Sequence, residues 1–421
     1  MPDMSLPKRL DPEQHKWLQP GPALILLDLL NKVRPLSTRF VGGCIRNSLM
    51  GQPVADIDLA TMHLPADVQK IAEAAGHKVV PTGIEYGTVT VIIAGQAFEV
   101  TTLRKDVETD GRRAVTAFST DWREDSQRRD FRFNAIYCDG SGSLYDPQGG
   151  IADALSREVV FIGKADERIT EDYLRILRYF RFFAWYGDGR PNREAITACA
   201  RLKDGIEKLS AERVWKELKN LLGAPDPVKS MRWMRTAEVL QQCFPGSRDV
   251  DQLAQLIASE QGLDWPVDPL LRFMALLDPN KARAASKKLK MSNAENTRIM
   301  AFANNGPVVP GEDFMDVSRR LYRKVVSGYV DAAKIALGKY EGRERRDIDD
   351  MLDFASEWER PVFPVTAKHL MDAGYEQGKK LGDLLWSLED EWITSGFALS
   401  TDELRAKIGN LGTGGKSGGQ G

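Results

Sequence analysis

The spacing of apolar and polar residues changes near residue 150 of the chain. Up to about residue 146, short apolar runs rich in β-branched residues alternate with Gly and Pro, a pattern typical of strands mixed with helices. The runs Thr88–Ile93 and Phe98–Leu103 are separated by Ala-Gly-Gln-Ala and predict a hairpin. Beyond about residue 151, apolar residues recur at helical spacing, and stretches such as Glu171–Trp185 and Ala211–Leu222 are predicted as helices. The sequence therefore predicts an α+β domain followed by all-helical domains.

Breaks that contain Pro or Gly divide the helical part into blocks. They fall at residues 187–192, 223–227, 304–311 and 360–364. The expected divisions, in chain order, are an α/β domain at 22–150, helical domains at 151–224, 225–305 and 306–411, and a flexible tail at 412–421. The tail is rich in glycine and lacks large apolar side chains, so burial cannot offset the entropy cost of ordering it.

Composition restricts the classes of protein and of metal site. The chain has 421 residues, 42% hydrophobic and 28% charged, which is typical of a globular protein. Its four cysteines form no C-x-x-C pair and its four histidines are scattered, which argues against a disulfide framework, a zinc cluster and a multi-histidine centre. Any catalytic metal must then be held by carboxylates. The 58 basic and 60 acidic residues give no overall attraction to nucleic acid, so an RNA partner would need local basic patches.

The first twenty to thirty residues predict neither a membrane span nor a secretion signal. The apolar stretch Ala23–Leu30 is interrupted by Asp28 and is far shorter than the about 20 residues that cross a bilayer. Residues 1–20 mix acidic and basic residues and lack the charged-then-apolar order of a signal peptide. We therefore expect a cytoplasmic protein without membrane contact.

The first chemical motif is Phe40-Val41-Gly42-Gly43-Cys44-Ile45-Arg46, followed by Asp56-Ile57-Asp58. A glycine pair between a strand and a helix lets backbone N–H groups approach phosphate oxygens, and Arg46 would add a charged contact. On a strand, Asp56 and Asp58 project to the same face and can hold Mg²⁺, as two-metal nucleotidyl transfer requires. Taken alone, the motif is better explained as a simple turn and a solvated strand end.

Two further motifs change that balance. They are Arg-Arg-Asp-Phe-Arg-Phe-Asn-Ala at residues 128–135 and Glu-Asp-Tyr-Leu-Arg-Ile-Leu-Arg-Tyr-Phe-Arg at residues 171–181. On a helix, Asp172, Arg175, Arg178 and Arg181 recur every three residues and cover one broad face. A surface ladder of ion pairs is the structural alternative, and the other two motifs argue against it.

With these motifs, the segment from about residue 40 to residue 222 resembles the class II tRNA nucleotidyltransferases, which build or repair the CCA end of tRNA, within the polymerase-β-like superfamily. Further matching segments lie at Thr82–Thr88, Phe98–Arg104, Tyr145–Pro147, Gly149–Gly150 and Leu209–Arg213. The resemblance implies a polymerase-β-like nucleotidyltransferase head, a helical neck that reads the nucleotide, and a helical body and tail, the tail contacting tRNA. It also implies tRNA, CTP and ATP as substrates and Mg²⁺ as cofactor.

The same resemblance leaves alternatives open. Bacterial poly(A) polymerases share the core motifs, but the segment after Gly87 reads Thr-Val-Thr-Val-Ile and lacks the basic run that marks those enzymes, which favours CCA addition. The polar stretch Lys105–Thr116, a candidate flexible element, favours full CCA addition over partial CC addition. An A-adding enzyme is a further partial form. A catalytically inactive RNA-binding relative is the alternative from another class, and intact Asp56, Asp58 and Arg129 argue against it.

Position by position, the resemblance assigns roles to residues of the head. Gly43 and Arg46 would grip the triphosphate, Asp56 and Asp58 would hold the metal ions, and Glu99 would add a carboxylate near the attacking hydroxyl.

The motif at residues 128–135 contributes two more residues. Arg129 would contact the incoming nucleotide, and Asp130 would reach its ribose. One departure from the family pattern is Asn47, because the Gly-Gly-x-x-Arg motif usually continues with Asp. This difference puts the local hydrogen-bond partner of Arg46 in question.

The resemblance assigns base reading to the third motif. Asp172 and Arg175 would read the base, with Arg178 and Arg181 reaching its phosphates or supporting that face. Cytosine and adenine each present an amino donor beside a ring nitrogen acceptor, which complements a carboxylate beside a guanidinium. Uracil and guanine present a carbonyl oxygen in place of the amino group, so they would leave buried groups unpaired.

Two basic stretches are candidates for contacts with tRNA phosphates. The first comprises Lys281, Arg283, Lys287, Lys288 and Lys290, and the second comprises Arg319, Arg320, Arg323 and Lys324. Solvated helix faces explain both stretches equally well.

Overall fold

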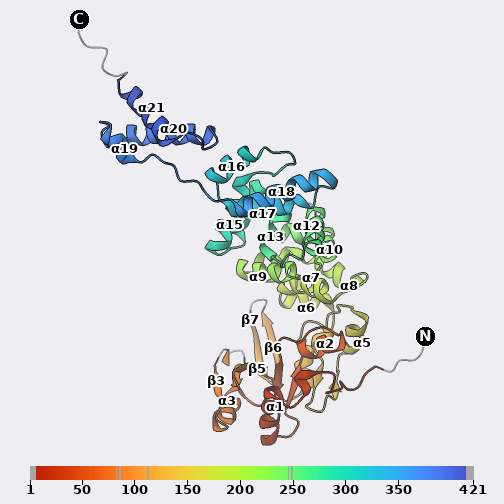
Figure 1. The fold of residues 1–421 in the computed structure, drawn as a ribbon. Helices are drawn as coiled ribbons and strands as arrows, with labels where there is room; N and C mark the ends of the chain where they lie inside the picture. The colour runs from red at the N-terminus through yellow and green to blue at the C-terminus, as the bar shows by residue number, and fades with distance from the viewer. Residues whose placement is uncertain are drawn as a thin grey trace. The chain divides into compact units, whose positions relative to one another are not determined.

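The computed structural model describes residues 6–413 except positions 82, 85, 86, 111, 112, 245, 248 and 249. The chain forms two compact units, residues 1–245 and 246–421, which follow each other along the colour gradient of Figure 1. Part of the matching segment Thr82–Thr88 and most of the tail predicted at 412–421 lie outside the described residues.

A seven-stranded mixed sheet is the centre of the first unit. Its strands, in sheet order, are β3 (Lys78–Val80), β4 (Thr88–Ile93), β5 (Gln96–Thr102), β2 (Asp58–Thr61), β1 (Thr38–Val41), β8 (Tyr137–Cys138) and β9 (Leu144–Tyr145). Strands β2 and β5 run parallel, and the other neighbouring pairs are antiparallel. The predicted hairpin is confirmed as β4 and β5, which turn through Ala94 and Gly95 at positive φ.

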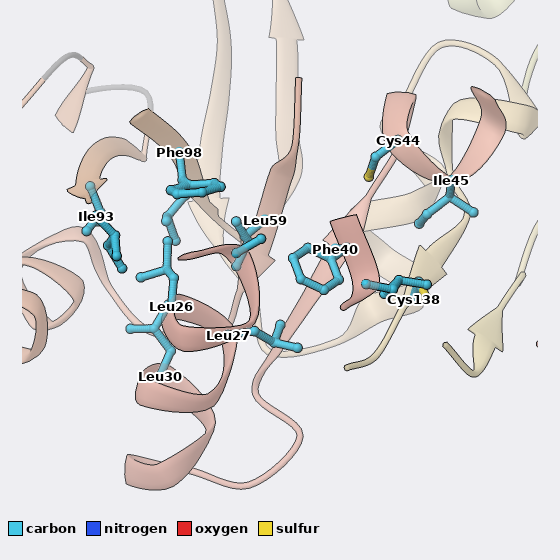
Figure 2. Close-up of a cluster of buried hydrophobic side chains, with 14 of the residues drawn as sticks. Leu26, Leu27, Leu30, Phe40, Cys44, Ile45, Leu59, Ile93, Phe98 and Cys138 are labelled. Carbon is cyan, nitrogen blue, oxygen red and sulfur yellow. The ribbon is translucent and has the colours of Figure 1, made fainter. Parts of the chain in front are cut away.

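Two helices, α1 (Pro22–Val33) and α3 (Pro65–Ala74), pack against this sheet. Figure 2 shows Leu26, Leu27 and Leu30 of α1 directed toward side chains of the sheet such as Phe40 and Phe98. Leu26 and Leu30 are four residues apart on one helical face, and both are fully buried. Burial of this apolar face is the main force that fixes the sheet.

The remaining elements of the first unit are short helices and a separate two-stranded ribbon. The ribbon consists of β6 (Arg104–Asp110) and β7 (Arg113–Phe118), so the stretch predicted as a flexible element forms strands on both sides of residues 111 and 112. The helices are η1 (Lys16–Leu18), α2 (Gly43–Leu49), α4 (Trp122–Gln127), η3 (Arg132–Asn134), α5 (Gly150–Ser156), α6 (Ala165–Glu171), α7 (Leu174–Tyr186), α8 (Arg193–Arg201), η4 (Lys203–Lys208), α9 (Ala211–Leu222), α10 (Val228–Thr236) and α11 (Val239–Cys243).

The helix predicted over residues 171–185 is interrupted. Helix α6 ends at Glu171 and α7 begins at Leu174, because Asp172 has an extended backbone with φ −151° and ψ 107°. The Asp172 carboxylate instead accepts a hydrogen bond of 3.1 Å from the Leu174 amide, as side chains at helix starts do. Asp172 therefore lies at a junction between two helices and not on the helical face of the three arginines.

The regular elements described in the second unit are all helical, as predicted. They are α12 (Asp251–Gly262), α13 (Pro269–Leu276), η5 (Pro279–Lys281), α14 (Ala282–Lys288), α15 (Asn293–Asn305), α16 (Phe314–Arg323), α17 (Val326–Leu337), α18 (Gly342–Glu357), α19 (Ala367–Asp372), α20 (Lys379–Thr394) and α21 (Thr401–Thr413). Among the described residues of the whole chain, none forms a helix that is both long and apolar enough to span a bilayer. All four cysteine side chains are buried, and none of the four is in a disulfide.

The buried face of α1 generates a prediction about stability. Leu30→Ala removes a fully buried side chain, so we expect the free energy of unfolding of the first unit to fall by about 2–5 kcal/mol. Ile25→Ala on the same helix is the control, because Ile25 is 50% exposed and should change that free energy by less than about 0.5 kcal/mol. Urea unfolding followed by circular dichroism measures both, and equal losses would contradict the assigned core.

Candidate active site

A sharp turn at Gly42 and Gly43 joins β1 to α2. Gly42 has φ 76° and ψ −115°, a conformation that side chains disfavour. A Cβ added at Gly42 would lie 3.5 Å from the Asn134 carbonyl oxygen and 3.9 Å from Arg129 Nη1. These distances are ordinary van der Waals contact, so the positive φ is what favours glycine at position 42, and the turn lies directly beside residues 128–135.

Three carboxylates gather next to this turn. Asp58 begins β2, Asp56 precedes it in the loop, and Glu99 lies on the neighbouring parallel strand β5, where Leu59 is paired with Val100. Burial and the charge of Glu99 raise the pKa of Asp58 to about 6, while Arg129 opposes the shift and Asp56 adds to it. The cluster thus concentrates negative charge at the start of β2, with Arg129 as the nearby cation.

The donor set of this cluster fits a divalent cation that arrives with a triphosphate. Within the described part of the chain, no group of three or more His, Cys, Asp or Glu side chains is placed to hold a metal ion. Mg²⁺ in phosphoryl-transfer sites is typically held by one or two carboxylates together with substrate phosphates, so a pair of aspartates is sufficient. Burial and repulsion from Glu99 and Asp56 raise the pKa of Asp58, and a bound cation would relieve the repulsion.

A buried carboxylate, Asp125 of α4, fixes the orientation of Arg129. The Asp125 side chain is 1% exposed and accepts hydrogen bonds from Arg128 Nε at 2.9 Å, Arg129 Nε at 3.2 Å and Tyr137 Oη at 2.7 Å. Burial acts to raise the pKa of Asp125, but the charges of Arg129 and Arg128 and the Tyr137 hydroxyl outweigh it, so the pKa lies below its ordinary value. Asp125 is not among the residues that the motifs predict for the site. Its spacing of three and four residues from the two arginines is the signal that points to it.

Asp130, in the motif at residues 128–135, connects that motif to helix α7. Its buried carboxylate accepts hydrogen bonds from the Phe131 amide at 2.9 Å, from Asn134 Nδ2 at 3.1 Å and from Arg178 Nε at 2.7 Å. Burial opposes ionisation, but Arg178 and these hydrogen bonds outweigh it and lower the pKa of Asp130 to about 2. A contact between Asp130 and a ribose stays a prediction.

Helix α9 supplies side chains that pair with charged residues of the motif at residues 171–181. Glu217 is 6% exposed, and its carboxylate lies 3.1 Å from Arg181 Nε and 3.8 Å from Arg178 Nη1. One turn earlier, Arg213 Nη2 lies 2.7 Å from Asp172 Oδ2. Neither Arg213 nor Glu217 is predicted as a site residue. Arg213 ends the matching segment Leu209–Arg213, and Glu217 is the next residue on the same helical face.

Arg175 is held at the junction between α6 and α7. Its Nη1 donates to the carboxylate of Glu171 and, at 2.7 Å, to the carbonyl oxygen of Arg168. Its Nη2 lies 3.3 Å from the carbonyl oxygen of Arg128. The structure therefore brings Arg175 to the Arg-Arg-Asp segment, although the two are more than forty residues apart in the sequence.

Arg46, which follows the turn at Gly42 and Gly43, is buried inside the protein. It is 6% exposed, and its guanidinium donates to the side-chain oxygens of Asn47, Asn134 and Tyr186. A contact between Arg46 and a triphosphate stays a prediction.

The two basic stretches differ in how their side chains are used. The second stretch makes contacts within the protein: Arg320 pairs with Glu312, Arg323 with Asp390, and Lys324 donates to the carbonyl of Asn304. Arg319 donates to the carbonyl oxygens of Ile393 and Thr394. The first stretch lies at α14, where Lys281, Arg283 and Lys287 are exposed.

The fold and the charged cluster define a nucleotidyltransferase. Residues 38–160 match the family model of the poly(A) polymerase head domain, and residues 192–250 match the model of a probable RNA- and SrmB-binding site of polymerase A. Nucleotidyltransferases of this family generally use a divalent metal ion.

Relatives of known activity narrow this class. The chain is 32% identical over 379 residues to the mitochondrial CCA tRNA nucleotidyltransferase 1 of Danio rerio. The alignment covers 88% of this chain and 86% of the relative. It is 31% identical over 383 residues to the CCA-adding enzyme of Streptococcus gordonii, and this alignment covers 86% of this chain and 91% of the relative. The chain therefore belongs to the family of CCA tRNA nucleotidyltransferases. The resemblance inferred from the motifs is confirmed, whereas a cytoplasmic location stays a prediction, since the Danio rerio relative is named as mitochondrial.

Solved structures show the same fold. The Bacillus stearothermophilus CCA-adding enzyme in complex with CTP has a TM-score of 0.71 at 22% identity and covers 94% of this chain and 98% of that one. The Thermotoga maritima CCA-adding enzyme complexed with tRNA has a TM-score of 0.64 at 18% identity, with coverage of 96% and 97%. The predicted fold class, a nucleotidyltransferase head followed by helical domains, is confirmed.

The buried cluster around Asp125 generates a prediction that depends on pH. Asp125→Asn keeps the side-chain shape but leaves Arg128 and Arg129 without their charged partner. We expect the free energy of unfolding of the first unit to fall by about 3–5 kcal/mol at neutral pH. Because the pKa of Asp125 is lowered in the folded protein, its stabilisation is present above the ordinary carboxyl pKa of about 3.9 and is lost as the pH falls through the folded value.

Urea unfolding at several pH values checks this expectation, and the gap between wild type and Asp125→Asn should narrow in acid. The control is Glu124→Gln on the same helix, since the Glu124 side chain is 37% exposed and pairs with Lys105 at the surface. A gap that is independent of pH, or an equal loss in the control, would contradict the assigned charge network.

Proposed function

We propose that this chain adds or repairs the 3′-terminal CCA of tRNA, using CTP and ATP, without a nucleic-acid template. The observation that carries the proposal is the cluster of Asp56, Asp58 and Glu99 next to the glycine turn, with Arg129 as its nearby cation. The relatives named as CCA-adding enzymes along nearly the whole chain support this activity over other nucleotidyl transfers.

We propose Mg²⁺ as the cofactor, held by Asp56 and Asp58. A bound ion of this kind supplies charge neutralisation for the triphosphate and lowers the pKa of the attacking 3′-hydroxyl. Glu99, exposed on the neighbouring strand, would add a carboxylate near that hydroxyl. Arg129 stays charged through its contact with Asp125, and it balances the phosphate charge on the side of the glycine turn.

Asp172 and Arg175 are proposed to read the base in place of a template strand. Asp172 Oδ1 accepts from the Leu174 amide and Oδ2 pairs with Arg213, and a carboxylate has further acceptor sites for a base amino group. Arg175 has five N–H donors, and its contacts with Glu171, Arg168 and Arg128 leave donors over for a ring nitrogen. Both groups are thus held in place and retain the capacity that cytosine and adenine need.

Poly(A) addition is the second candidate, because both matching family models are named for poly(A) polymerase. The two candidates differ in the length and composition of the product. A CCA-adding enzyme stops after three nucleotides and needs CTP, whereas a poly(A) polymerase continues with ATP alone.

The first test supplies the purified chain with Mg²⁺, CTP, ATP and a tRNA that lacks its three terminal nucleotides. We expect extension by C, C and A followed by a stop, and loss of addition when a chelator removes the metal. Asp58→Asn should lower the rate by about 10²–10³-fold because it removes a proposed metal ligand, and the exposed Asp67→Asn serves as control. Sequencing gels report the products. Unlimited A addition would identify a poly(A) polymerase, and no addition by the wild type would identify a silent RNA-binding relative.

The second test concerns nucleotide choice. The double variant Asp172→Ala with Arg175→Ala should still add nucleotides but accept UTP and GTP more readily, because the groups that exclude them are gone. Each unpaired group costs about 1–3 kcal/mol, so discrimination should fall by about 5- to 150-fold. Incorporation rates with each of the four triphosphates measure this, with the exposed Arg193→Ala as control. Unchanged selectivity in the double variant would refute the assignment.

A further inference from the structure

Tyr173 lies at the junction between α6 and α7, between the two residues proposed to read the base. Asp172, directly before it, has an extended backbone, so α6 does not continue into α7 as one helix. The carbonyl oxygen of Asp172 accepts from the Arg175 amide at 3.0 Å, and that of Tyr173 accepts from the Ile176 amide at 3.1 Å. These residues share one short stretch of backbone, so a contact that holds Tyr173 also restrains Asp172 and Arg175.

The ring of Tyr173 packs directly on the backbone of Gly205 in η4. Gly205 is buried, and a Cβ added there would lie 1.8 Å from Tyr173 Cδ1, 2.0 Å from Cε1 and 2.4 Å from Cγ. The φ of Gly205 is not positive, so the position needs glycine for space and not for its backbone conformation. The Nζ atom of Lys208 lies 5.0 Å from the centre of the same ring. A side chain at position 205 therefore has no room while the ring occupies this place.

Helix η4 is itself held in place by α11 and by burial. Gln242 Nε2 of α11 donates to Asp204 Oδ1 at 2.9 Å. The residue after Gly205, Ile206, is 3% exposed, so removal of its apolar side chain from water anchors the segment. Gly205 is therefore a fixed support for the Tyr173 ring.

A second contact holds the same junction from α9. Arg213 Nη2 lies 2.7 Å from Asp172 Oδ2, but the two side chains are 49% and 36% exposed. Ion pairs with this exposure contribute little, because water screens them and two flexible side chains must be ordered. The close packing of Tyr173 on Gly205 is therefore the stronger restraint on the direction of the junction.

We propose that Tyr173 is a positioning residue for nucleotide choice: its ring, packed on Gly205, sets the direction in which Asp172 and Arg175 present their hydrogen-bonding groups. The inference rests on the proposed base-reading role of these two residues. Tyr173 does not have to touch the nucleotide for this role, because donors and acceptors distinguish bases only when they are held at the right distance and angle. Loss of the ring should therefore weaken the choice between nucleotides more than the chemistry.

The first test measures kcat and KM of the full-length chain for CTP and UTP, on a tRNA that lacks its three terminal nucleotides. We expect Tyr173→Ala to lower the preference for CTP over UTP, as the ratio of kcat/KM values, by about tenfold. The loss should come chiefly from a higher KM for CTP, with kcat for CTP within about threefold of wild type. Tyr173→Phe keeps the ring and should retain the preference within about twofold. An unchanged preference in Tyr173→Ala, or an equal loss in Tyr173→Phe, would overturn the proposal.

The second test addresses the contact with Gly205 itself. Gly205→Ala places a methyl group where the Tyr173 ring lies, so the preference should again fall by about tenfold. In the double variant Gly205→Ala with Tyr173→Ala the ring is absent, so the preference should equal that of Tyr173→Ala alone within about twofold. A loss of about a hundredfold, the product of the two single losses, would show that the two residues act independently and would contradict the proposed contact.

Gly140→Ala is the matched control for a crowded glycine, because a Cβ there would lie 2.9 Å from Leu27 Cδ2 of α1. It should lower the thermal stability but leave the preference within about twofold of wild type. If Gly205→Ala does not fold, the comparison of Tyr173→Ala with Tyr173→Phe decides alone. A folded wild type that does not prefer CTP and ATP over UTP and GTP would contradict base reading and hence the proposed function. A selective wild type whose preference survives Tyr173→Ala would refute only the role of Tyr173.

Discussion

The ion pair between Asp130 and Arg178 sets the geometry on which the proposed site depends. Asp130 belongs to the segment beside the glycine turn, and Arg178 belongs to helix α7, so this pair fixes the arginine-rich helix to the domain that carries the aspartates. Asp130 is 9% exposed and its pKa is lowered to about 2, so the pair persists wherever the protein is folded near neutral pH. Removal of one partner of such a pair costs more than its formation gains, because the other charge stays buried.

Buried or half-buried guanidinium groups serve the same purpose at several points of the first unit. Arg129 is held by Asp125, Arg181 by Glu217, and Arg168 donates to the carbonyl oxygens of Arg128 and Arg129. The planar fork of arginine suits this use, because its donors are fixed relative to one another and each contact restrains the others. In contrast, the carboxylates at the start of β2 repel one another, and this repulsion adds to burial in raising the pKa of Asp58. The site therefore combines arginines held by carboxylates and backbone carbonyls with a separate cluster of acidic side chains.

The sequence predicts the class of fold and the main motifs because these depend on local patterns. The β-branched runs at Thr88–Ile93 and Phe98–Leu103 form the predicted hairpin, and the predicted helix at Ala211–Leu222 has the same limits as α9. The partners of the motif residues could not be predicted in this way, because they lie far away in the sequence. Arg213 pairs with Asp172 across 41 positions, and Asp390 neutralises Arg323 across 67. No local pattern shows such pairs, so the sequence alone does not reveal that Arg213 is the partner of Asp172 or that Arg323 is paired within the protein. The helical spacing of apolar residues continues across Asp172, so the extended backbone of this one residue could not be predicted from the sequence.

Cys44, which follows the two glycines, has a consequence for the redox sensitivity of the protein. Its thiol is 1% exposed, and burial together with the nearby charge of Asp58 raises its pKa to about 12. Burial likewise raises the pKa of the Cys138 and Cys199 thiols. The thiolate is the form that peroxides and alkylating reagents attack, and at neutral pH almost none of it exists at these positions. The cysteine that follows the glycine turn is therefore a poor target for such reagents.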